Sequence, residues 1–160
     1  MIAIDTNLLV YAHRSQTPEH AAARAALERA ASDPDGWGTT LTNVLEFWSI
    51  VTHPAATGRP STPAQALRFF AGLTAGGLAD IWVPGAGFAD RLMRVARDLG
   101  VKGVRVFDLA VALTAFEAGA SEVWTHDLHF RSVPGLRVVF PLLEKRRESR
   151  RIGPQPPPGA

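Results

Sequence analysis

The sequence predicts an α/β fold with a parallel β-sheet that helices cover on both faces. Short apolar runs bounded by turn residues alternate with longer segments whose apolar residues recur at helical spacing. Strands separated in this way by helices are joined by right-handed crossovers and run parallel. The chain has 160 residues, about the size of one domain, and its 46% hydrophobic and 20% charged residues are typical of an ordinary globular protein.

The first predicted strand and the first predicted helix meet at Asp5. An apolar run, Met1-Ile2-Ala3-Ile4, leads into this acid, and apolar residues then resume at helical spacing. Asp5 therefore follows the carboxyl end of a strand. In open α/β sheets this edge binds ligands, because the loops there leave a crevice lined by helix N-termini.

Capping residues, proline and glycine set the other predicted boundaries. We expect a helix from Thr17 to about Ala31, with Thr17 as its cap and Pro18 at its first position. Further helices are expected to begin at Thr42 or Asn43, at Thr62, near Phe88 and near Asp108, and to end at or before Pro54, Gly76, Gly100 and Gly119. Strands are expected at residues 37–41, 81–83, 122–125 and 136–140.

The apolar patterns of these helices indicate which faces are buried. Residues 44–51 carry apolar side chains on nearly every face, so this helix is predicted to be buried. The helix that follows Thr62 has a narrower stripe, Ala66, Leu67, Phe70 and Leu73. The helix near Asp108 is expected to bury Leu109, Ala112, Leu113 and Phe116.

Three later acids, Glu46, Asp108 and Asp127, occupy junctions comparable to that of Asp5. Taken singly, each has an ordinary explanation. Asp5 and Asp108 suit helix N-caps, Asp127 suits a turn, and Glu46 suits an ion pair or a solvent-facing position. Glu46 is the most informative, because a carboxylate on a helix predicted to be buried needs a partner or a metal ion.

Taken together, the four acids predict a metal site. Four carboxylates gathered at one sheet edge would repel one another strongly unless cations lay between them. Carboxylate oxygens suit Mg²⁺ or Mn²⁺, and the absence of cysteine removes the soft thiolate ligands. Carboxylate sites of this kind that are open to solvent typically serve phosphoryl chemistry.

Four short motifs carry a resemblance to a known family. The first is Ile4-Asp5-Thr6-Asn7-Leu8-Leu9-Val10-Tyr11-Ala12, and the second is Thr42-Asn43-Val44-Leu45-Glu46-Phe47. The third is Phe107-Asp108-Leu109-Ala110-Val111-Ala112, and the fourth is Thr125-His126-Asp127-Leu128-His129-Phe130. In order and spacing they resemble the motifs of PIN domains, and more closely those of the VapC toxins of bacterial type II toxin–antitoxin systems. The likeness covers residues 1 to 143.

The resemblance implies a PIN-like three-layer α/β/α fold around a central, mostly parallel twisted sheet of four to five strands. It implies that Asp5, Glu46, Asp108 and Asp127 bind Mg²⁺ or Mn²⁺ and are catalytic, and that Thr6, Asn7 and Thr125 orient these ligands. His129 departs from the pattern, because many relatives have a further aspartate there. The implied activity is that of a metal-dependent endoribonuclease that hydrolyses phosphodiester bonds in structured RNA such as tRNA or ribosomal RNA. The implied partners are a VapB-like antitoxin and a second copy of the chain.

Residues 144–160 lie outside the resemblance and are expected to form a flexible, proline-rich tail. Residues 145–151 hold five of the seventeen Lys and Arg and one of the fifteen acids, so residues 1–144 carry twelve basic and fourteen acidic residues, a net charge of −2. Such a tail suits a polyanion, and RNA contacts are expected from Lys145, Arg146, Arg147, Arg150 and Arg151. A solubilising terminus is the alternative.

No secretory signal or membrane-spanning stretch is recognised, and the lack of cysteine suits the cytoplasm.

Other functions stay open at the level of sequence. One alternative is a noncatalytic RNA-binding module or an antitoxin-bound scaffold, in which the acids serve only as caps. Another is a PIN nuclease of RNA processing that is not paired with an antitoxin. A metal-free nuclease would use His126, His129 and Lys102, but their spacing forms no motif. A phosphatase with an aspartyl nucleophile would need a second aspartate two residues after Asp5, where the chain has Asn7.

Overall fold

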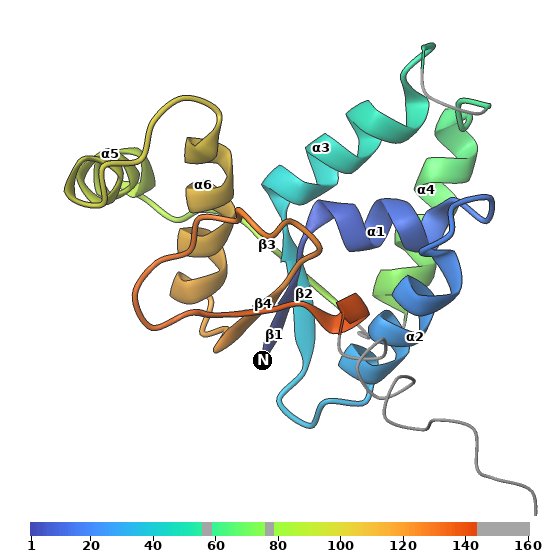
Figure 1. The fold of residues 1–160 in the computed structure, drawn as a ribbon, viewed down its shortest axis with the longest axis horizontal. Coiled ribbons are helices and arrows are strands. Elements are labelled where there is room, and N and C mark those ends of the chain that lie inside the picture. Colours follow the sequence, from blue (N-terminus) through green and yellow to red (C-terminus); the bar gives the residue numbers. More distant parts are fainter. Residues whose placement is uncertain (56–58, 76–78, 144–160) are drawn as a thin grey trace, which may run out of the picture.

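The fold is built on a five-stranded parallel sheet. The computed structural model describes residues 1–55, 59–75 and 79–143. The strands are β1 (Ile2–Ile4), β2 (Trp37–Thr40), β3 (Asp80–Trp82), β4 (Glu122–Trp124) and β5 (Arg137–Val139). Their order across the sheet is β3-β2-β1-β4-β5, and every neighbouring pair is parallel (Figure 1). The predicted α/β fold with a parallel sheet is confirmed, and each later strand lies within about one residue of its predicted place.

In the described residues, six α-helices connect and cover these strands. They are α1 (Thr6–His13), α2 (His20–Ala31), α3 (Leu41–Thr52), α4 (Pro63–Thr74), α5 (Phe88–Asp98) and α6 (Arg105–Glu117). Helices α5 and α6 lie on one side of the sheet, and α1, α2 and α4 lie on the other (Figure 1). In the described parts of the chain, no helix is long and apolar enough to span a membrane.

Two hydrophobic clusters lie on opposite faces of the sheet. Ile2 and Ile4 point into a core shared with α1 to α4, where Leu8, Leu9 and Phe47 are fully buried. Ala3 points the other way, into a core shared with α5 and α6. This alternation along β1 follows from the two-residue period of a strand, and it explains why the central strand is apolar at every position.

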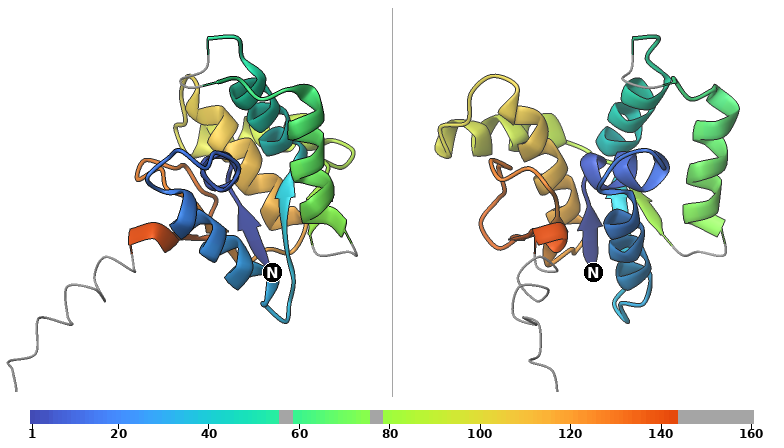
Figure 2. Two further views of the ribbon diagram at one scale, coloured as in Figure 1. Left: turned by 90° about the vertical axis from the view of Figure 1, so that its right-hand side faces the viewer. Right: turned by 45° about the vertical axis from the view of Figure 1, so that its right-hand side comes forward.

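The central position of β1 sets what lies beside Asp5. In the sheet, Ile4 is paired with Trp124 of β4, and Ala3 is paired with Gly38 of β2. The backbone N–H of Asp5 continues the ladder by donating to the carbonyl oxygen of Trp124 at 3.0 Å. The carboxyl ends of β1, β2 and β4 therefore meet at one edge, where α1 and α3 begin (Figure 2).

Gly38 marks a close approach between β2 and β3. A Cβ atom added at this glycine would lie 2.6 Å from the carbonyl oxygen of Asp80 and 2.7 Å from the ring of Trp82. A Cβ atom essentially never lies this close to a nonbonded heavy atom, so any side chain at position 38 would force the two strands apart. The chain needs glycine here for space.

Some predicted helix starts are wrong. The helix expected from Thr17 begins at His20, because residues 15–19 form turns and the Thr17 hydroxyl donates to the carbonyl oxygen of Arg14. The cap of α3 is Thr40, two or three residues earlier than the predicted Thr42 or Asn43. The start of α4 is confirmed, since Thr62 caps it and exchanges hydrogen bonds with Gln65 in a capping box.

Helix α3 is not buried as predicted. Asn43, Phe47 and Val51 face the core along one stripe, at the i, i+4 spacing of a single helical face. Val44 is partly buried against the same core, whereas Leu41, Leu45, Trp48 and Ile50 are exposed, with Leu45 63% accessible. Three other predicted core residues also differ. Leu67 and Phe116 are exposed, and Leu73 is only partly buried, while Phe69 packs against the core instead.

Residues 76–78 and 144–160 lie outside the described part of the chain. The predicted glycine stop of α4 at Gly76 falls there, as does the predicted basic tail.

Candidate active site

Asp5 is the buried centre of the candidate site. It follows β1 and caps α1, with its side chain accepting from the backbone N–H of Thr6 at 2.7 Å. The same oxygen, Oδ1, accepts from the amide of Asn43 at 3.1 Å. Oδ2 accepts from the amide of Asn7 at 2.7 Å and from the hydroxyl of Thr125 at 2.6 Å. Both carboxylate oxygens are therefore fixed in direction by neutral donors.

Burial raises the pKa of the Asp5 carboxyl to about 6. Loss of hydration is the largest cause, and the negative charges of Glu46 and Asp108 add to it. The hydrogen bonds from Thr125 and from the Thr6 backbone lower the pKa but do not offset the burial. The four hydrogen bonds that Asp5 accepts all come from neutral groups, so the buried carboxylate has only partial compensation for its charge.

Glu46 lies on the edge of the site and is solvent-exposed. The hydroxyl of Thr6 donates to its Oε2 at 2.6 Å, which links α3 to the first turn of α1. The predicted burial of Glu46 is wrong, because only one stripe of α3 faces the core and Glu46 lies beside that stripe. The carboxylate that loses its hydration on folding is that of Asp5.

Asp108 and Asp127 share one arginine. Helix α6 begins at Arg105, so Asp108 lies in its first turn and is not its N-cap. One guanidinium nitrogen of Arg105 donates to Oδ2 of Asp108 at 3.0 Å and to Oδ2 of Asp127 at 2.7 Å. Partial burial raises the pKa of the Asp127 carboxyl, but the His129 backbone N–H and Arg105 outweigh this effect and hold the pKa below its usual value.

A network of neutral side chains joins these segments. The amide of Asn7 donates to Thr125 as well as to Asp5, and Asn7 Oδ1 accepts from the backbone N–H of His126 at 2.9 Å. Asn43 is fully buried and donates to the Thr6 hydroxyl at 3.0 Å. In the sequence, Asn43 is a candidate helix cap and part of the second motif, and no contact with Asp5 is predicted for it. The signal that it contacts Asp5 lies in the pairing of β1 with β2, which places the start of α3 beside the start of α1.

All four predicted acids line one pocket of about 260 Å³. Its other lining residues are Thr6, Asn7, Val10, Tyr11 and Ile50. Thr125 lies directly behind it, through its contacts with Asp5 and Asn7. The five basic residues of the predicted RNA-binding tail lie outside the described part of the chain.

Arg105 pairs with two of the four acids that are candidates to bind a cation. In the orientations seen, the residues that the structure describes include no group of three histidine, aspartate or glutamate side chains that would hold a metal ion. Asp108 and Asp127 are turned toward Arg105, which occupies the place of a counterion between them. The donors themselves are hard carboxylate oxygens, the type that Mg²⁺ and Mn²⁺ prefer.

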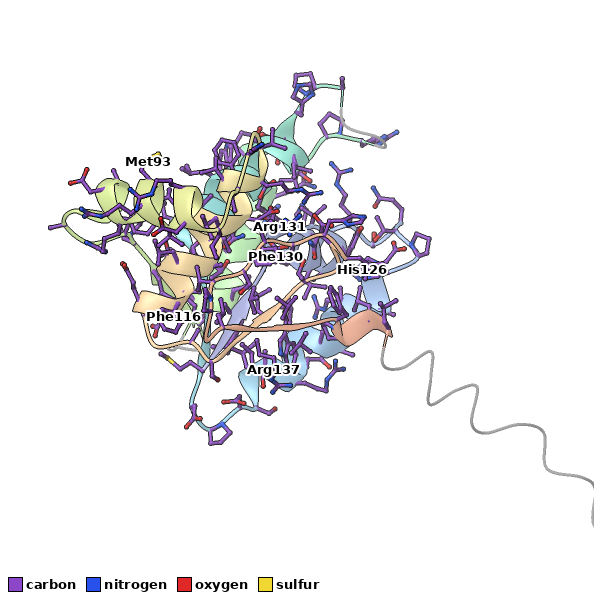
Figure 3. All side chains as sticks on the ribbon, turned by 60° about the vertical axis from the view of Figure 1, so that its left-hand side comes forward. Met93, Phe116, His126, Phe130, Arg131 and Arg137 are labelled. Carbon is purple, nitrogen blue, oxygen red and sulfur yellow. The ribbon has the colours of Figure 1, made fainter. Side chains whose placement is uncertain are left out.

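The two histidines of the fourth motif, His126 and His129, do not line the acidic pocket. His126, labelled in Figure 3, lies on the segment after β4, and its ring meets that of Tyr11 edge to face at 5.8 Å. His129 contributes its backbone N–H to Asp127. Neither histidine lines the acidic pocket, and Lys102 does not line it either. The geometry therefore gives no support to a metal-free site built from these three residues.

Comparison with known proteins assigns the chain to a family. The profile of the PIN domain family matches residues 2–136. The chain belongs to the PIN-domain family. It is 31% identical to ribonuclease VapC43 of Mycobacterium tuberculosis over 121 residues, which are 76% of this chain and 82% of that protein. The resemblance of this PIN domain to the VapC group, expected from its four motifs, is therefore confirmed.

Solved structures confirm the fold of this PIN domain. One is VapC20 of Mycobacterium tuberculosis, described as a sarcin–ricin loop cleaving toxin, with a TM-score of 0.62 and 14% identity over 81% of this chain and 92% of that one. Another is VapBC2 of Rickettsia felis bound to a DNA fragment from its promoter, with a TM-score of 0.63 and 18% identity. That match covers 87% of this chain and 98% of the other. At these identities the likeness concerns the fold alone.

Proposed function

We propose that this PIN domain is the toxin of a type II toxin–antitoxin system and a metal-dependent endoribonuclease that cleaves structured RNA such as tRNA or ribosomal RNA. The observation that carries the proposal is the single acidic pocket. Carboxylates from four separate segments of the chain line it, and one of them, Asp5, is buried among neutral donors. Ribonuclease VapC43 of Mycobacterium tuberculosis is 31% identical to this chain over 121 residues, which supports the same reaction here.

We infer that Asp5, Glu46, Asp108 and Asp127 hold Mg²⁺ or Mn²⁺. The pocket fits such a cation because its donors are hard oxygens and because the charge of buried Asp5 lacks a nearby cation among its hydrogen-bond partners. A divalent ion in the pocket supplies a Lewis acid that activates water and offsets the charge developing on the phosphate.

The chain's own residues prepare the pocket for this reaction. Thr6, Asn7, Asn43 and Thr125 hold the two oxygens of Asp5 in fixed directions, which keeps the ligand geometry constant. The Thr6 hydroxyl holds Glu46 at the rim. Arg105 neutralises Asp108 and Asp127 in the structure, and a divalent ion held by these carboxylates would take over that role.

Substitution of the acids tests the nuclease proposal. Asp5→Ala and Asp108→Ala should each abolish Mn²⁺-dependent cleavage across a panel of tRNA and ribosomal RNA fragments while leaving the circular dichroism spectrum unchanged. Asp90→Ala is the matched control, because Asp90 is an exposed acid on α5, outside the pocket. Cleavage retained by both pocket variants would refute the proposal.

A thermal titration separates this proposal from a noncatalytic RNA-binding module. A ligand that binds only the folded state raises the melting temperature with its concentration. Mn²⁺ should therefore raise the melting temperature of the wild type, and the increase should be lost in Asp108→Ala. Equal curves for the two proteins would favour the module whose acids are only caps.

We propose a VapB-like antitoxin as a partner and the cytoplasm as the site of action. Two solved structures with a similar fold support this pairing, VapBC2 of Rickettsia felis bound to a DNA fragment from its promoter and FitAB bound to the IR36 DNA fragment. A small upstream reading frame that encodes a DNA-binding fold with a basic tail would support the pairing. Its absence would favour a PIN nuclease of RNA processing.

We also propose a homodimer that uses the exposed face of α3. Leu45 and Trp48 leave an apolar patch there, 63% and 41% accessible. Analytical ultracentrifugation should give a dimer for the wild type and a monomer for Leu45→Ser combined with Trp48→Ser. An unchanged sedimentation coefficient in the double variant would exclude this face as the interface.

A further inference from the structure

A second pocket, of about 650 Å³, lies beside the C-terminal end of α1. Three arginines line it, Arg14, Arg59 and Arg68, and we call it the arginine pocket. Its lining includes no acidic residue, and the remaining polar groups are neutral hydroxyls and amides such as Ser61 and Gln65. Among the described residues, no carboxylate lies within ion-pair distance of Arg59 or Arg68. The pocket therefore presents positive charge to solvent.

The wall of the arginine pocket is held in place by His13. Its Nε2 lies 2.8 Å from the hydroxyl oxygen of Ser61, and its ring meets Phe47 and Phe69 edge to face at 5.3 and 5.1 Å. Burial lowers the pKa of His13, and the charge of Arg14 lowers it further, so the imidazole is neutral at pH 7. The charge of the pocket comes from its arginines, which stay protonated across the physiological range.

The arginine pocket adjoins the acidic pocket through α1 and α3. Val10 and Tyr11 of α1 line the acidic pocket, and His13 of the next turn lines the arginine pocket. The Arg14 guanidinium donates to the carbonyl oxygen of Ile50 at 3.2 Å, and Ile50 lines the acidic pocket. The two pockets are thus separated by a few side chains, with opposite charge on either side.

We propose that the arginine pocket binds backbone phosphates of the RNA strand on one side of the cleavage site. This inference rests on the proposed ribonuclease function. Arginine, serine, threonine and glutamine are among the side chains that contact nucleic-acid phosphates, and all four types line this pocket. An acidic pocket repels a polyanion, so a cationic surface directly beside it supplies the attraction needed to bring a phosphate to the carboxylates.

An acidic protein segment is the competing occupant. RNA is favoured because a single strand has a phosphate at every nucleotide, so that one molecule can place one phosphate at the carboxylates and its neighbours at the arginines. An acidic segment would have no group to place in the acidic pocket.

The test compares two double variants that remove the same charge. Arg59→Gln with Arg68→Gln removes two arginines of the pocket. Arg94→Gln with Arg97→Gln removes two exposed arginines of α5, which lies on the opposite side of the molecule from α4 (Figure 1). Both variants keep the basic tail, so any contribution of the tail is the same in each.

Binding is measured by fluorescence anisotropy with a fluorescein-labelled single-stranded RNA of mixed sequence, in EDTA so that the strand is not cleaved. The logarithm of the affinity should fall linearly with the logarithm of salt concentration, with about 0.7 of slope for each phosphate neutralised. Loss of two contacts in the pocket variant should lower the slope by about 1.4 relative to the wild type, and the α5 variant should keep the wild-type slope.

The outcomes separate this inference from the proposed function. An unchanged slope in the pocket variant, or an equal loss in the α5 variant, would overturn the inference, and Mn²⁺-dependent cleavage by the wild type would then stand by itself. A reduced slope in the pocket variant, together with no RNA cleavage by the wild type in Mn²⁺, would support the phosphate site and contradict the nuclease. Loss of affinity for the purified antitoxin with unchanged RNA binding would assign the pocket to an acidic protein segment and overturn the inference.

Discussion

Buried Asp5 should make the metal-free protein less stable as pH rises from about 4 to about 6. Its carboxyl has a pKa of about 6 in the folded protein against a reference value of 3.8. A difference of about two pH units corresponds to about 3 kcal/mol of unfolding free energy, at about 1.4 kcal/mol per unit. This is a substantial part of the total stability of a domain of this size.

The sign follows from the order in which the two states lose the proton. In the unfolded chain Asp5 ionises near its reference pKa, whereas in the folded chain it keeps the proton until about pH 6. Between these values the folded state binds more protons, so each increment of pH favours unfolding. Below this interval the penalty is absent, and above it the penalty is complete and constant.

The assay is urea unfolding followed by tryptophan fluorescence in EDTA, at about pH 4 and about pH 7. Asp5→Asn is the control, because it keeps the shape of the side chain and removes its titration. Other groups act in the opposite direction, including Asp127 with its lowered pKa, so the measured quantity is the difference between the two proteins at each pH. The wild type should lose about 3 kcal/mol relative to the variant on going to pH 7.

A pH-independent difference between wild type and Asp5→Asn would refute the claim that Asp5 carries a buried, poorly compensated charge. Mn²⁺ provides a second check. It should restore more stability to the wild type at pH 7 than at pH 4, because the ion binds the ionised carboxylates.

Three further predictions concern other parts of the chain. Arg105→Gln should raise the affinity for Mn²⁺ severalfold, measured by calorimetry without RNA, because no guanidinium then competes for Asp108 and Asp127. An unchanged or weaker affinity would contradict this competition. Asn43→Ala should lower the unfolding free energy, measured in urea, by about 1–3 kcal/mol, because Asp5 and the Thr6 hydroxyl each lose a buried hydrogen-bond donor. A loss within error of zero would argue against the hydrogen-bond network around Asp5. Gly38→Ala should lower the unfolding free energy by about 1–3 kcal/mol through overpacking. Gly72→Ala, in open space on α4, should instead raise it by up to about 1 kcal/mol. Thermal unfolding that ranks the two variants the other way would refute the steric argument.

The regular elements of this protein could be predicted from the sequence because local signals agreed. Thr62, Pro63 and Gln65 specify the start of α4, and the capping box forms as expected. The start of α2 could not be found in the same way. Thr17 and Pro18 are an equally good local start, but the Thr17 hydroxyl is used by the preceding turn. Competition between a cap and a nearby backbone acceptor is decided by the path of the chain.

Burial was less predictable than secondary structure. The apolar residues of α3 suggested a buried helix, yet Leu45 and Trp48 are exposed while Phe47 between them is fully buried. Composition shows that a segment is apolar but does not show how many neighbours it has. That number depends on where the helix lies against the sheet, and in this fold α3 presents only one stripe to the core.

By itself, the sequence determined the alternation of strands and helices, the four acids and the motifs that place the chain among PIN domains. Those signals are local in the chain, since strand ends, caps and motif spacing involve residues close together. Only the tertiary structure decided that Asp5 is the buried acid and Glu46 the exposed one, that Asn43 contacts Asp5, and that Arg105 bridges two carboxylates. These relations join residues far apart in sequence, and they arise only when the parallel strands bring their carboxyl ends to one edge.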